Sequence, residues 1–328
     1  MYNAAEHDNK ANVELALSCW FLTGATASGK SQTSLHLAER LNAEIISLDS
    51  MAIYRGMDIG TAKPGPTEQS RVPHHLIDVV DPTEQFSVSQ YRDAALAKVQ
   101  QIQSTGKQVL FVGGTALYLK ALLRGMFDGP PADWDFRKQI EAEIAEDGAG
   151  ILHQRLEMVD PVAASNLHPN DHRRIIRALE VYKTTGKPIS HLQMEFDEGN
   201  AAENCRVFTI RHDRAILHER IEGRVEMMFE VGLIEEVQTL LKTWNALGHT
   251  ASQAVGYREV IDFLNGDKTK DEMVELVKIR TRRFARHQET WFRGLSECEI
   301  IDIDKDFEAE QLAGLIFEKG QAREISET

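Results

Sequence analysis

Residues 24–31 form the segment GATASGKS, which fits the phosphate-binding pattern G-x-x-x-x-G-K-[ST]. A short apolar run, residues 18–22, precedes this segment, and residues 31–41 follow it with the apolar spacing of a helix. Such a loop turns several backbone N–H groups inward, toward the positive end of the next helix. Lys30 adds a mobile cation, and the hydroxyl of Ser31 suits Mg²⁺. The sequence therefore predicts a diphosphate site made by Gly24, Ala25, Thr26, Ala27, Ser28, Gly29, Lys30 and Ser31.

Further strand and helix patterns alternate along the first part of the chain. Residues 44–48 and 108–112 are short apolar runs typical of buried strands, and residues 116–123 are helical in pattern. Alternating strands and helices predict an α/β fold, with a P-loop nucleotide-binding-type parallel sheet flanked by helices. Ligands bind at the carboxyl ends of such strands. We therefore expect three loops to converge on one site, namely residues 24–31, 49–55 and 113–115.

The pattern changes near residue 128, where Gly129-Pro130-Pro131 interrupts the chain. Residues 134–200 are mostly helical in pattern, whereas residues 206–211 and 299–303 are again typical of strands. The simplest interpretation is a catalytic core interrupted by an inserted all-helical domain. The predicted parts are a disordered tail at 1–12, a core at 13–127 and 203–305, a helical insertion at 128–202 and a peripheral acidic tail at 306–328.

Composition limits the class of protein. The cysteines, Cys19, Cys205 and Cys298, lack metal-ligand spacing, which favours a reducing cytoplasm over a structural zinc site. No apolar run is long enough to span a membrane, and the first residues do not have the pattern of a signal peptide. We expect no membrane contact and no obligate protein partner, with the chain acting as a monomer.

The phosphate loop does not by itself identify its ligand, and ATP is the commonest one. The run at 108–112 ends in Gly113-Gly114-Thr115, without the aspartate that holds Mg²⁺ in many ATPases. Asp49, at the end of the preceding strand, could bind metal, accept a proton, hydrogen-bond an amine or simply cap a turn. The adjacent pair His74-His75 is interpreted as structural rather than metal-binding.

Two segments are basic although the net charge is −14. Residues 278–293, KIRTRRFARHQETWFR, carry six lysines and arginines, and Lys278, Arg282 and Arg286 follow one stripe of a helix. Residues 171–187, DHRRIIRALEVYKTTGK, carry a second cluster. Solvated helix faces would explain both segments, and so would contacts with the phosphates of a nucleic acid.

The order of several longer segments resembles the tRNA dimethylallyltransferases of bacteria. The resemblance covers residues 18–295 and includes SLDSMAIYRGMDIGTAKP, VPHHLIDVVDP, VGGTALYLKALLRG, NDHRRIIRALEVYKTTGKPIS, AVGYRE and TRRFARHQETWFRG. It implies transfer of a dimethylallyl group from dimethylallyl diphosphate to N6 of adenosine-37, beside the anticodon of tRNAs that read codons beginning with U. The products would be N6-dimethylallyladenosine and pyrophosphate, and Mg²⁺ would be the cofactor.

The same resemblance implies roles for particular residues. Asp49 would be the general base, and Thr115 and Arg224 would bind the diphosphate. The resemblance also implies a tRNA interface, to which Asp49 and Thr115 belong as well. Its residues are Asp49, Ser50, Met51, Ala52, Thr115, Arg137, Arg173, Arg174, Ile175, Ile176, Arg177, Ser252, Gln253, Ala254, Val255, Gly256, Tyr257, Arg286, His287, Gln288, Glu289, Thr290, Trp291, Phe292 and Arg293.

Some positions depart from the family pattern. Ala52 stands where glutamine is usual, and Arg173 where glutamine is common. His287 and Glu289 change the usual lysine-arginine-glutamine-x-threonine-tryptophan stretch. Three other functions remain open from the residues alone: a prenyltransferase acting on free adenine nucleotides, an ATP-dependent small-molecule kinase, and an RNA-binding module with a vestigial loop.

Overall fold

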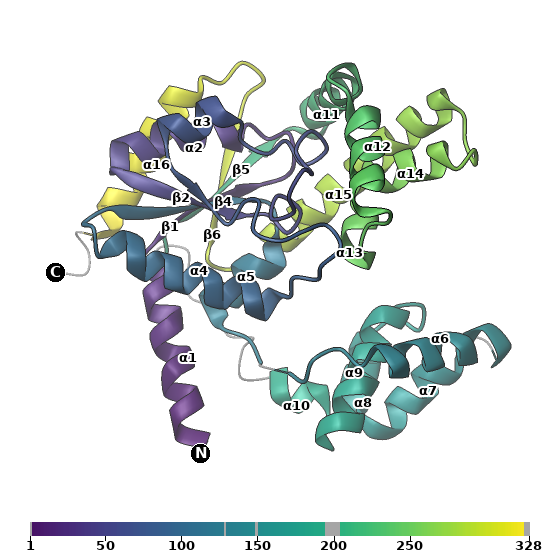
Figure 1. Cartoon of the computed structure of the whole chain (residues 1–328). Coiled ribbons are helices and arrows are strands. Elements are labelled where there is room, and N and C mark those ends of the chain that lie inside the picture. Colours follow the sequence, from purple (N-terminus) through teal and green to yellow (C-terminus); the bar gives the residue numbers. More distant parts are fainter. Residues whose placement is uncertain (1, 128, 148–149, 194–203, 325–328) are drawn as a thin grey trace. The chain divides into compact units, whose positions relative to one another are not determined.

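The computed structural model describes residues 2–127, 129–147, 150–193 and 204–324 (Figure 1). The chain forms two compact units, one made by Met1–Leu123 with Gly199–Thr328 and the other by Arg124–Glu198. The second unit falls where the sequence predicted a helical insertion at 128–202.

The larger unit is built on a parallel sheet. Within the described residues its strand order is β3-β2-β4-β1-β5-β6, and every neighbouring pair is parallel. The prediction of a parallel α/β sheet is confirmed, and the predicted strand ends lie within two residues of those observed. The short strand β3 was not predicted, because two residues carry no alternating pattern. The strands are β1 (Trp20–Gly24), β2 (Ala43–Leu48), β3 (His74–His75), β4 (Gln108–Gly113), β5 (Val207–His212) and β6 (Cys298–Ile303).

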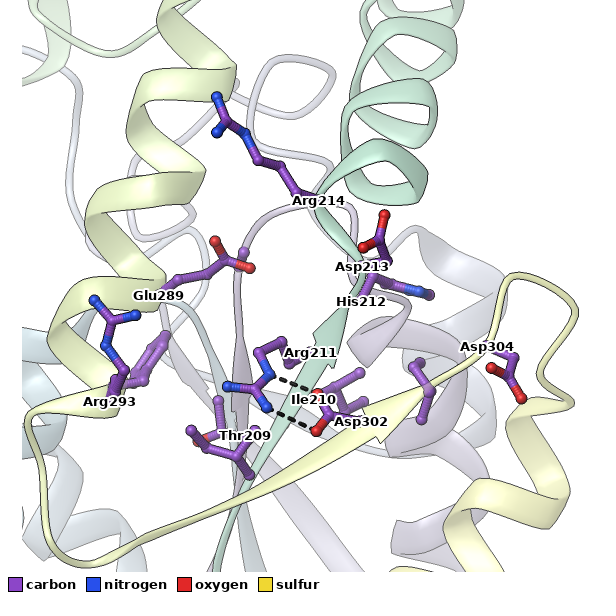
Figure 2. A pocket seen from close by; sticks show the side chains of 14 residues that line it. Thr209, Ile210, Arg211, His212, Asp213, Arg214, Glu289, Arg293, Asp302 and Asp304 are labelled. Atoms are coloured by element: carbon purple, nitrogen blue, oxygen red, sulfur yellow. Dashed lines mark hydrogen bonds and ion pairs between the residues drawn. The ribbon is translucent and has the colours of Figure 1, made fainter.

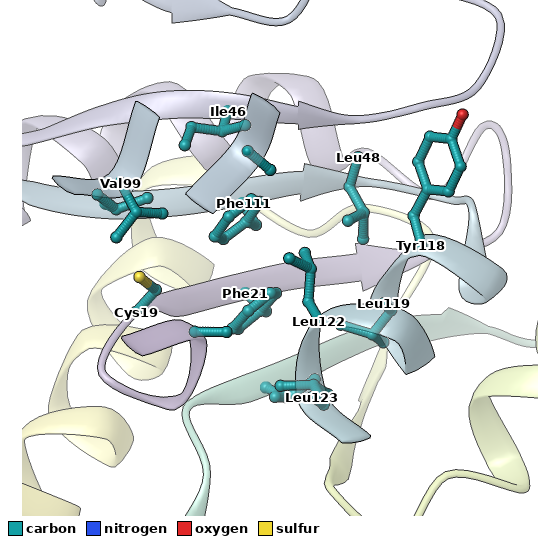
Figure 3. Close-up of a cluster of buried hydrophobic side chains, with 14 of the residues drawn as sticks. Cys19, Phe21, Ile46, Leu48, Val99, Phe111, Tyr118, Leu119, Leu122 and Leu123 are labelled. Carbon is teal, nitrogen blue, oxygen red and sulfur yellow. The ribbon is translucent and has the colours of Figure 1, made fainter. Parts of the chain in front are cut away.

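Successive side chains of each central strand enter different cores, because strand side chains alternate between the two faces. Phe21 and Phe111 stack 4.8 Å apart on the face covered by α1 (Tyr2–Leu17), α4 (Val88–Gln103) and α5 (Ala116–Arg124) (Figure 3). Leu22 and Leu110 pack on the other face, against α2 (Lys30–Leu41) and α16 (Ala309–Glu324). Both faces are therefore apolar, which leaves the strand ends as the polar edge of the sheet.

Five further helices form a group of their own beside the strand ends. They are α11 (Arg214–Glu230), α12 (Leu233–Trp244), α13 (His249–Ser252), α14 (Tyr257–Leu264) and α15 (Lys270–Arg293). Ile53, Tyr54 and Met57, from the loop after β2, are fully buried among α12, α13 and α14. This packing anchors the loop that begins at Asp49. The short helix α3 (Pro66–Arg71) then leads into β3.

The predictions for the two chain ends are wrong within the described residues. The segment predicted as a disordered tail at 1–12 belongs to α1, whose last turn inserts Ala16 into the core. The acidic segment 306–328, predicted as peripheral, contains α16, in which Leu312, Ala313 and Ile316 are buried against the sheet. The apolar stripe of α16 is short and lies among charged residues, so overall acidity concealed it.

In the part of the smaller unit that the structure describes, all the regular secondary structure is helical. Its core joins apolar side chains such as Leu152, Leu156 and Ile175. Asp160 orders part of the unit, because it caps α8 at the N–H of Ala163 (2.9 Å) and accepts a 2.7 Å bond from Ser190. The helices are α6 (Trp134–Asp147), α7 (Gly150–Val159), α8 (Pro161–Asn166), α9 (His172–Thr185) and α10 (Ile189–Gln193).

Candidate functional site

The loop between β1 and α2 has the backbone of a phosphate-binding loop. Gly29, at the start of α2, has φ of 92°, and Gly24 has φ of 144°, values that L side chains rarely adopt. A Cβ on Gly24 would lie 2.6 Å from the carbonyl oxygen of Ile210, and one on Gly29 would overlap the ring of Phe307. Only glycine fits at both positions. The predicted strand-loop-helix context is therefore present, and the N-terminus of α2 faces the loop.

Lys30 is held in the loop by Ala25 and Ser28. Its Nζ donates to the Ala25 carbonyl oxygen (2.6 Å) and to Ser28 Oγ (3.4 Å). Burial and the positive charge of Arg224 lower the pKa of Lys30 to about 7, against the opposing effect of Asp49. Burial also lowers the pKa of Arg224, again opposed by Asp49. Lys30, Arg224 and the carboxylate of Asp49 therefore share a desolvated site, in which a bound anion would stabilise the charged form of Lys30.

The loops after β2 and β4 are joined through Thr115. Its Oγ1 accepts a 3.1 Å hydrogen bond from the N–H of Ser50. Asp49 Oδ1 accepts from the N–H of Met51 (2.8 Å) and of Ala52 (3.3 Å), which fixes the carboxylate. The three predicted site loops therefore meet. Asp49 lies near Lys30 and Arg224, and its neighbour Ser50 is hydrogen-bonded to Thr115.

Other groups hold these loops in place, and the sequence patterns did not identify their roles. Arg220 Nε donates to the Ala27 carbonyl oxygen of the phosphate loop (2.8 Å). The carboxylate of Glu236 accepts hydrogen bonds from the N–H groups of Asp58 (3.1 Å) and Ile59 (2.7 Å), which follow Asp49 in the chain. Both residues lie far from the loops along the chain, so no local motif could have indicated these contacts.

Lys63 and the histidine pair have structural partners. Lys63 is almost fully buried, and its Nζ lies 2.6 Å from carboxylate oxygens of both Asp58 and Asp78. His75 pairs with Glu44 (2.6 Å), and His74 contacts the Val72 carbonyl oxygen (2.7 Å). These contacts agree with the interpretation of the histidines as structural.

The basic segment on α15 is partly neutralised by carboxylates. Lys278 pairs with Glu226 (2.7 Å), and Arg282 pairs with Glu222, so two members of the predicted basic stripe contact α11. Arg280 forms an ion pair with the fully buried Glu259, which belongs to α14. Of the two explanations left open by the sequence, neither a free solvated face nor free phosphate-binding charges describes Lys278 and Arg282, because both are paired within the chain. Among residues 278–293, the exposed arginines for which no ion pair is found in the described part of the chain are Arg283, Arg286 and Arg293.

Several residues assigned to the tRNA interface have buried side chains, which cannot reach RNA without repacking. Ile175 and Ile176 lie in the core of the smaller unit. In the larger unit, Ala52, Ala254, Tyr257, Gln288 and Phe292 are less than 9% exposed, and Gly256 is also buried. These assignments are corrected because each motif is amphipathic and only its outer face is accessible. The exposed or partly exposed members in this unit are Asp49, Ser50, Met51, Thr115, Ser252, Gln253, Val255, Arg286, His287, Glu289, Thr290, Trp291 and Arg293.

In the smaller unit, Glu180 organises the predicted arginines. This fully buried carboxylate accepts two bonds from Arg137 (2.8 and 2.9 Å), one from Arg177 and one from the N–H of Asp133 (2.7 Å). Arg137 and Arg177 remain partly exposed, whereas Arg173 and Arg174 are exposed at the start of α9. The four arginines therefore differ: Glu180 fixes Arg137 and Arg177, whereas Arg174 forms a 3.4 Å ion pair with Asp171 at the surface and Arg173 is exposed.

A cavity of about 550 Å³ lies at the ends of β5 and β6 and reaches Ala25 of the phosphate loop. Figure 2 shows Arg211 bonded to both oxygens of Asp302 (2.5 and 2.7 Å), with Glu289 and Arg293 coming from α15. Burial raises the pKa of Glu289, although nearby arginines oppose the effect. The cavity is thus lined by mixed charges and does not by itself specify a ligand.

The described residues contain no cluster of three or more histidine, cysteine or acidic side chains that could hold a metal ion. A magnesium ion bound mainly by a substrate diphosphate and water needs only one or two protein ligands. The exposed hydroxyl of Ser31, beside Lys30, meets that requirement. All three cysteines are free, and no helix among the described residues has the length and apolar character needed to cross a bilayer.

The parallel sheet and the loop between β1 and α2 define a P-loop-type α/β protein, with a candidate phosphate site at its strand ends. A family model described as IPP transferase matches residues 52–295, and the chain belongs to this family of prenyltransferases. A tRNA dimethylallyltransferase of Rhodopirellula baltica is 49% identical over 84% of this chain and 85% of the relative. One of Pelotomaculum thermopropionicum is 45% identical over 89% and 93%, respectively.

Solved structures show the same relationship. The full-length tRNA isopentenylpyrophosphate transferase of Bacillus halodurans is 38% identical, with a TM-score of 0.67 over 95% of this chain and 99% of that chain. A eukaryotic dimethylallyltransferase, described as acting on tRNA, is 26% identical, with a TM-score of 0.71 over 93% of this chain and 77% of that one. The family resemblance of the sequence is therefore confirmed.

Proposed function

We propose that the chain transfers a dimethylallyl group from dimethylallyl diphosphate to N6 of adenosine-37 in tRNAs that read codons beginning with U. The observation that carries this proposal is the shared environment of Lys30, Arg224 and Asp49 at the ends of β1 and β2. Two cations suit a diphosphate leaving group, and an adjacent carboxylate suits an amine that must lose a proton. Membership of the IPP transferase family supports the choice of these two substrates.

In the proposed reaction, N6 of adenine forms a bond to C1 of the dimethylallyl group. The bond from C1 to the diphosphate oxygen breaks, and its electron pair leaves with pyrophosphate. Asp49 accepts the proton that N6 loses, because its Oδ1 is held by two backbone N–H groups while the carboxylate keeps further acceptor capacity. Lys30, Arg224 and the loop N–H groups balance the charge that develops on pyrophosphate.

Thr115 has two roles in this proposal. Its hydroxyl accepts a hydrogen bond from the N–H of Ser50 and so orients the loop that carries Asp49. We infer that Thr115 also contacts the diphosphate, as the family resemblance implies. The Ser31 hydroxyl would hold Mg²⁺, which supplies further neutralisation of the diphosphate when it is bound.

The acceptor adenine must leave the stacked anticodon loop to reach these groups, as happens for other enzymes that modify bases. We infer that Ser50 and Met51 lie beside that base, together with the backbone of Ala52. The exposed residues Gln253, Arg286 and Trp291 would contact the RNA from the larger unit. Arg137, Arg173, Arg174 and Arg177 would do so from the smaller unit.

One incubation tests this proposal. The chain is mixed with Mg²⁺, dimethylallyl diphosphate and an anticodon stem-loop with three consecutive adenosines, and the RNA is analysed by mass spectrometry. We expect a gain of one dimethylallyl group without ATP. Prenylation of added AMP but not of RNA would identify a nucleotide prenyltransferase instead, and ATP consumption without prenylation would identify a kinase.

A further inference from the structure

The side chain of Gln288 spans two loops of the phosphate site. This residue lies on α15 and is only 7% exposed. Its Oε1 accepts a 2.8 Å hydrogen bond from the N–H of Thr26, in the phosphate loop. Its Nε2 donates a 2.9 Å hydrogen bond to the carbonyl oxygen of Gly114, after β4. Both ends of the amide are therefore used inside the protein.

The two partners require the two ends of an amide. The N–H of Thr26 needs an acceptor and the carbonyl of Gly114 needs a donor, so neither a carboxylate nor an amine can replace both bonds. The position is also closely packed, because a Cβ on Gly114 would overlap with Gln288 Nε2. Gly114 must therefore be a glycine for the amide to fit between the loops.

We propose that Gln288 is a positioning residue for the diphosphate of the prenyl donor and not an RNA contact. It sets the spacing between Thr26, in the loop that carries Lys30, and Gly114, the neighbour of Thr115. Thr115 in turn holds Ser50, beside Asp49. The amide of Gln288 thus fixes the loop that carries Lys30, which binds the leaving diphosphate, relative to the loops that carry Thr115 and Asp49. This inference rests on the proposed function.

The test compares Gln288→Met, which keeps the length of the side chain but removes both hydrogen bonds, with Gln311→Met as the matched control. Gln311 is an exposed glutamine on α16 whose amide donates a 2.6 Å hydrogen bond to the nearby Glu308. We measure the donor KM, kcat, the tRNA Kd and the affinity for pyrophosphate with Mg²⁺ by calorimetry. In Gln288→Met the donor KM rises and pyrophosphate affinity falls, each about tenfold, as loss of two buried hydrogen bonds implies. The tRNA Kd stays within about twofold, and Gln311→Met changes none of these quantities.

Gln288→Glu is the second variant and is close to isosteric. It keeps an acceptor for Thr26 but loses the N–H that Gly114 needs and adds a negative charge near the diphosphate. Pyrophosphate affinity therefore falls further than in Gln288→Met. Weaker tRNA binding with unchanged pyrophosphate affinity in either variant would overturn the proposal and make Gln288 an RNA contact. A lower Tm with all affinities unchanged would also overturn it.

The pyrophosphate measurement separates this inference from the proposed function. Pyrophosphate binding that depends on Gln288, in a chain that does not prenylate RNA, would contradict only the proposed transfer reaction. Prenylation of RNA with a donor KM that is insensitive to both Gln288 variants would contradict only the positioning role.

Discussion

The N–H of Ser50 donates a 3.1 Å hydrogen bond to Thr115 Oγ1, although 65 residues separate them along the chain. The bond connects the loop after β2 to the loop after β4, which are neighbouring strands of the sheet. It therefore fixes the start of the segment that carries Asp49 against the segment that follows Gly114. The geometry of this candidate site depends on connections between loops rather than on any single motif.

Replacement of Asp49 tests its role as the base. We expect Asp49→Ala to lower kcat by about 10²- to 10⁴-fold, the usual contribution of a general base. The tRNA Kd should change little, because the carboxylate acts on a single proton of the acceptor. Asp49→Asn is the structural control, since its amide oxygen can still accept from Met51 and Ala52. A loss of tRNA affinity as large as the loss of rate in both variants would exclude the general-base role.

Arg286 and Arg282 lie one helical turn apart on α15 but differ in environment. Arg286 is exposed, whereas Arg282 pairs with Glu222. We expect Arg286→Ala to weaken tRNA binding and to reduce the slope of log K against log salt by about 0.7 to 0.9, the effect of one phosphate contact. Arg282→Ala should leave that slope unchanged. Titrations of a labelled anticodon stem-loop at several salt concentrations measure both, and equal slopes for the two variants would show that Arg286 does not meet a phosphate.

Glu180 gives the smaller unit an acid-sensitive link. Burial would raise the pKa of Glu180, but hydrogen bonds from Arg137, Arg177 and the N–H of Asp133 outweigh burial and hold that pKa below its ordinary value. The carboxylate therefore stabilises the folded unit above the unfolded pKa, about 4.3, and this contribution is lost as pH falls through the folded pKa.

We expect Glu180→Gln to destabilise the smaller unit by about 2 kcal/mol at pH 7, since both arginines lose their charged partner but remain partly hydrated. Hydrogen exchange of residues 133–185, read by mass spectrometry, measures the effect. The difference from the native chain should begin to shrink as pH falls below the unfolded pKa, about 4.3, and should be lost once pH is below the lower, folded pKa. A difference that stays constant down to pH 3 would contradict the assigned charge state.

The C-terminal helix should contribute to the stability of the core. Ile316 is fully buried between α16 and the sheet, whereas its neighbour Leu315 is 44% exposed. We expect Ile316→Ala to lower the free energy of unfolding by about 3 kcal/mol and Leu315→Ala by less than about 1 kcal/mol. Urea titration measures both values. Equal, small effects would mean that α16 does not pack on the sheet.

The sequence by itself determined the parallel sheet, the ends of all its strands except β3, and the glycine-rich loop after β1. These features depend on local patterns, because apolar runs, glycines and a helix start are all read within about ten residues. The resemblance to a family added Asp49, Thr115 and Arg224, and the structure brings Asp49 and Arg224 into one electrostatic environment with Lys30.

Only the tertiary structure decided which members of each motif are accessible. Lys278 and Arg282 belong to a basic segment, yet both face carboxylates of α11, which no pattern within α15 could indicate. Gln288 lies between the exposed His287 and the partly exposed Glu289, and it points inward to Thr26 and Gly114. Burial and ion pairing depend on residues that are distant in the chain, so a local pattern can show that a charge or an amide is present but not where it points.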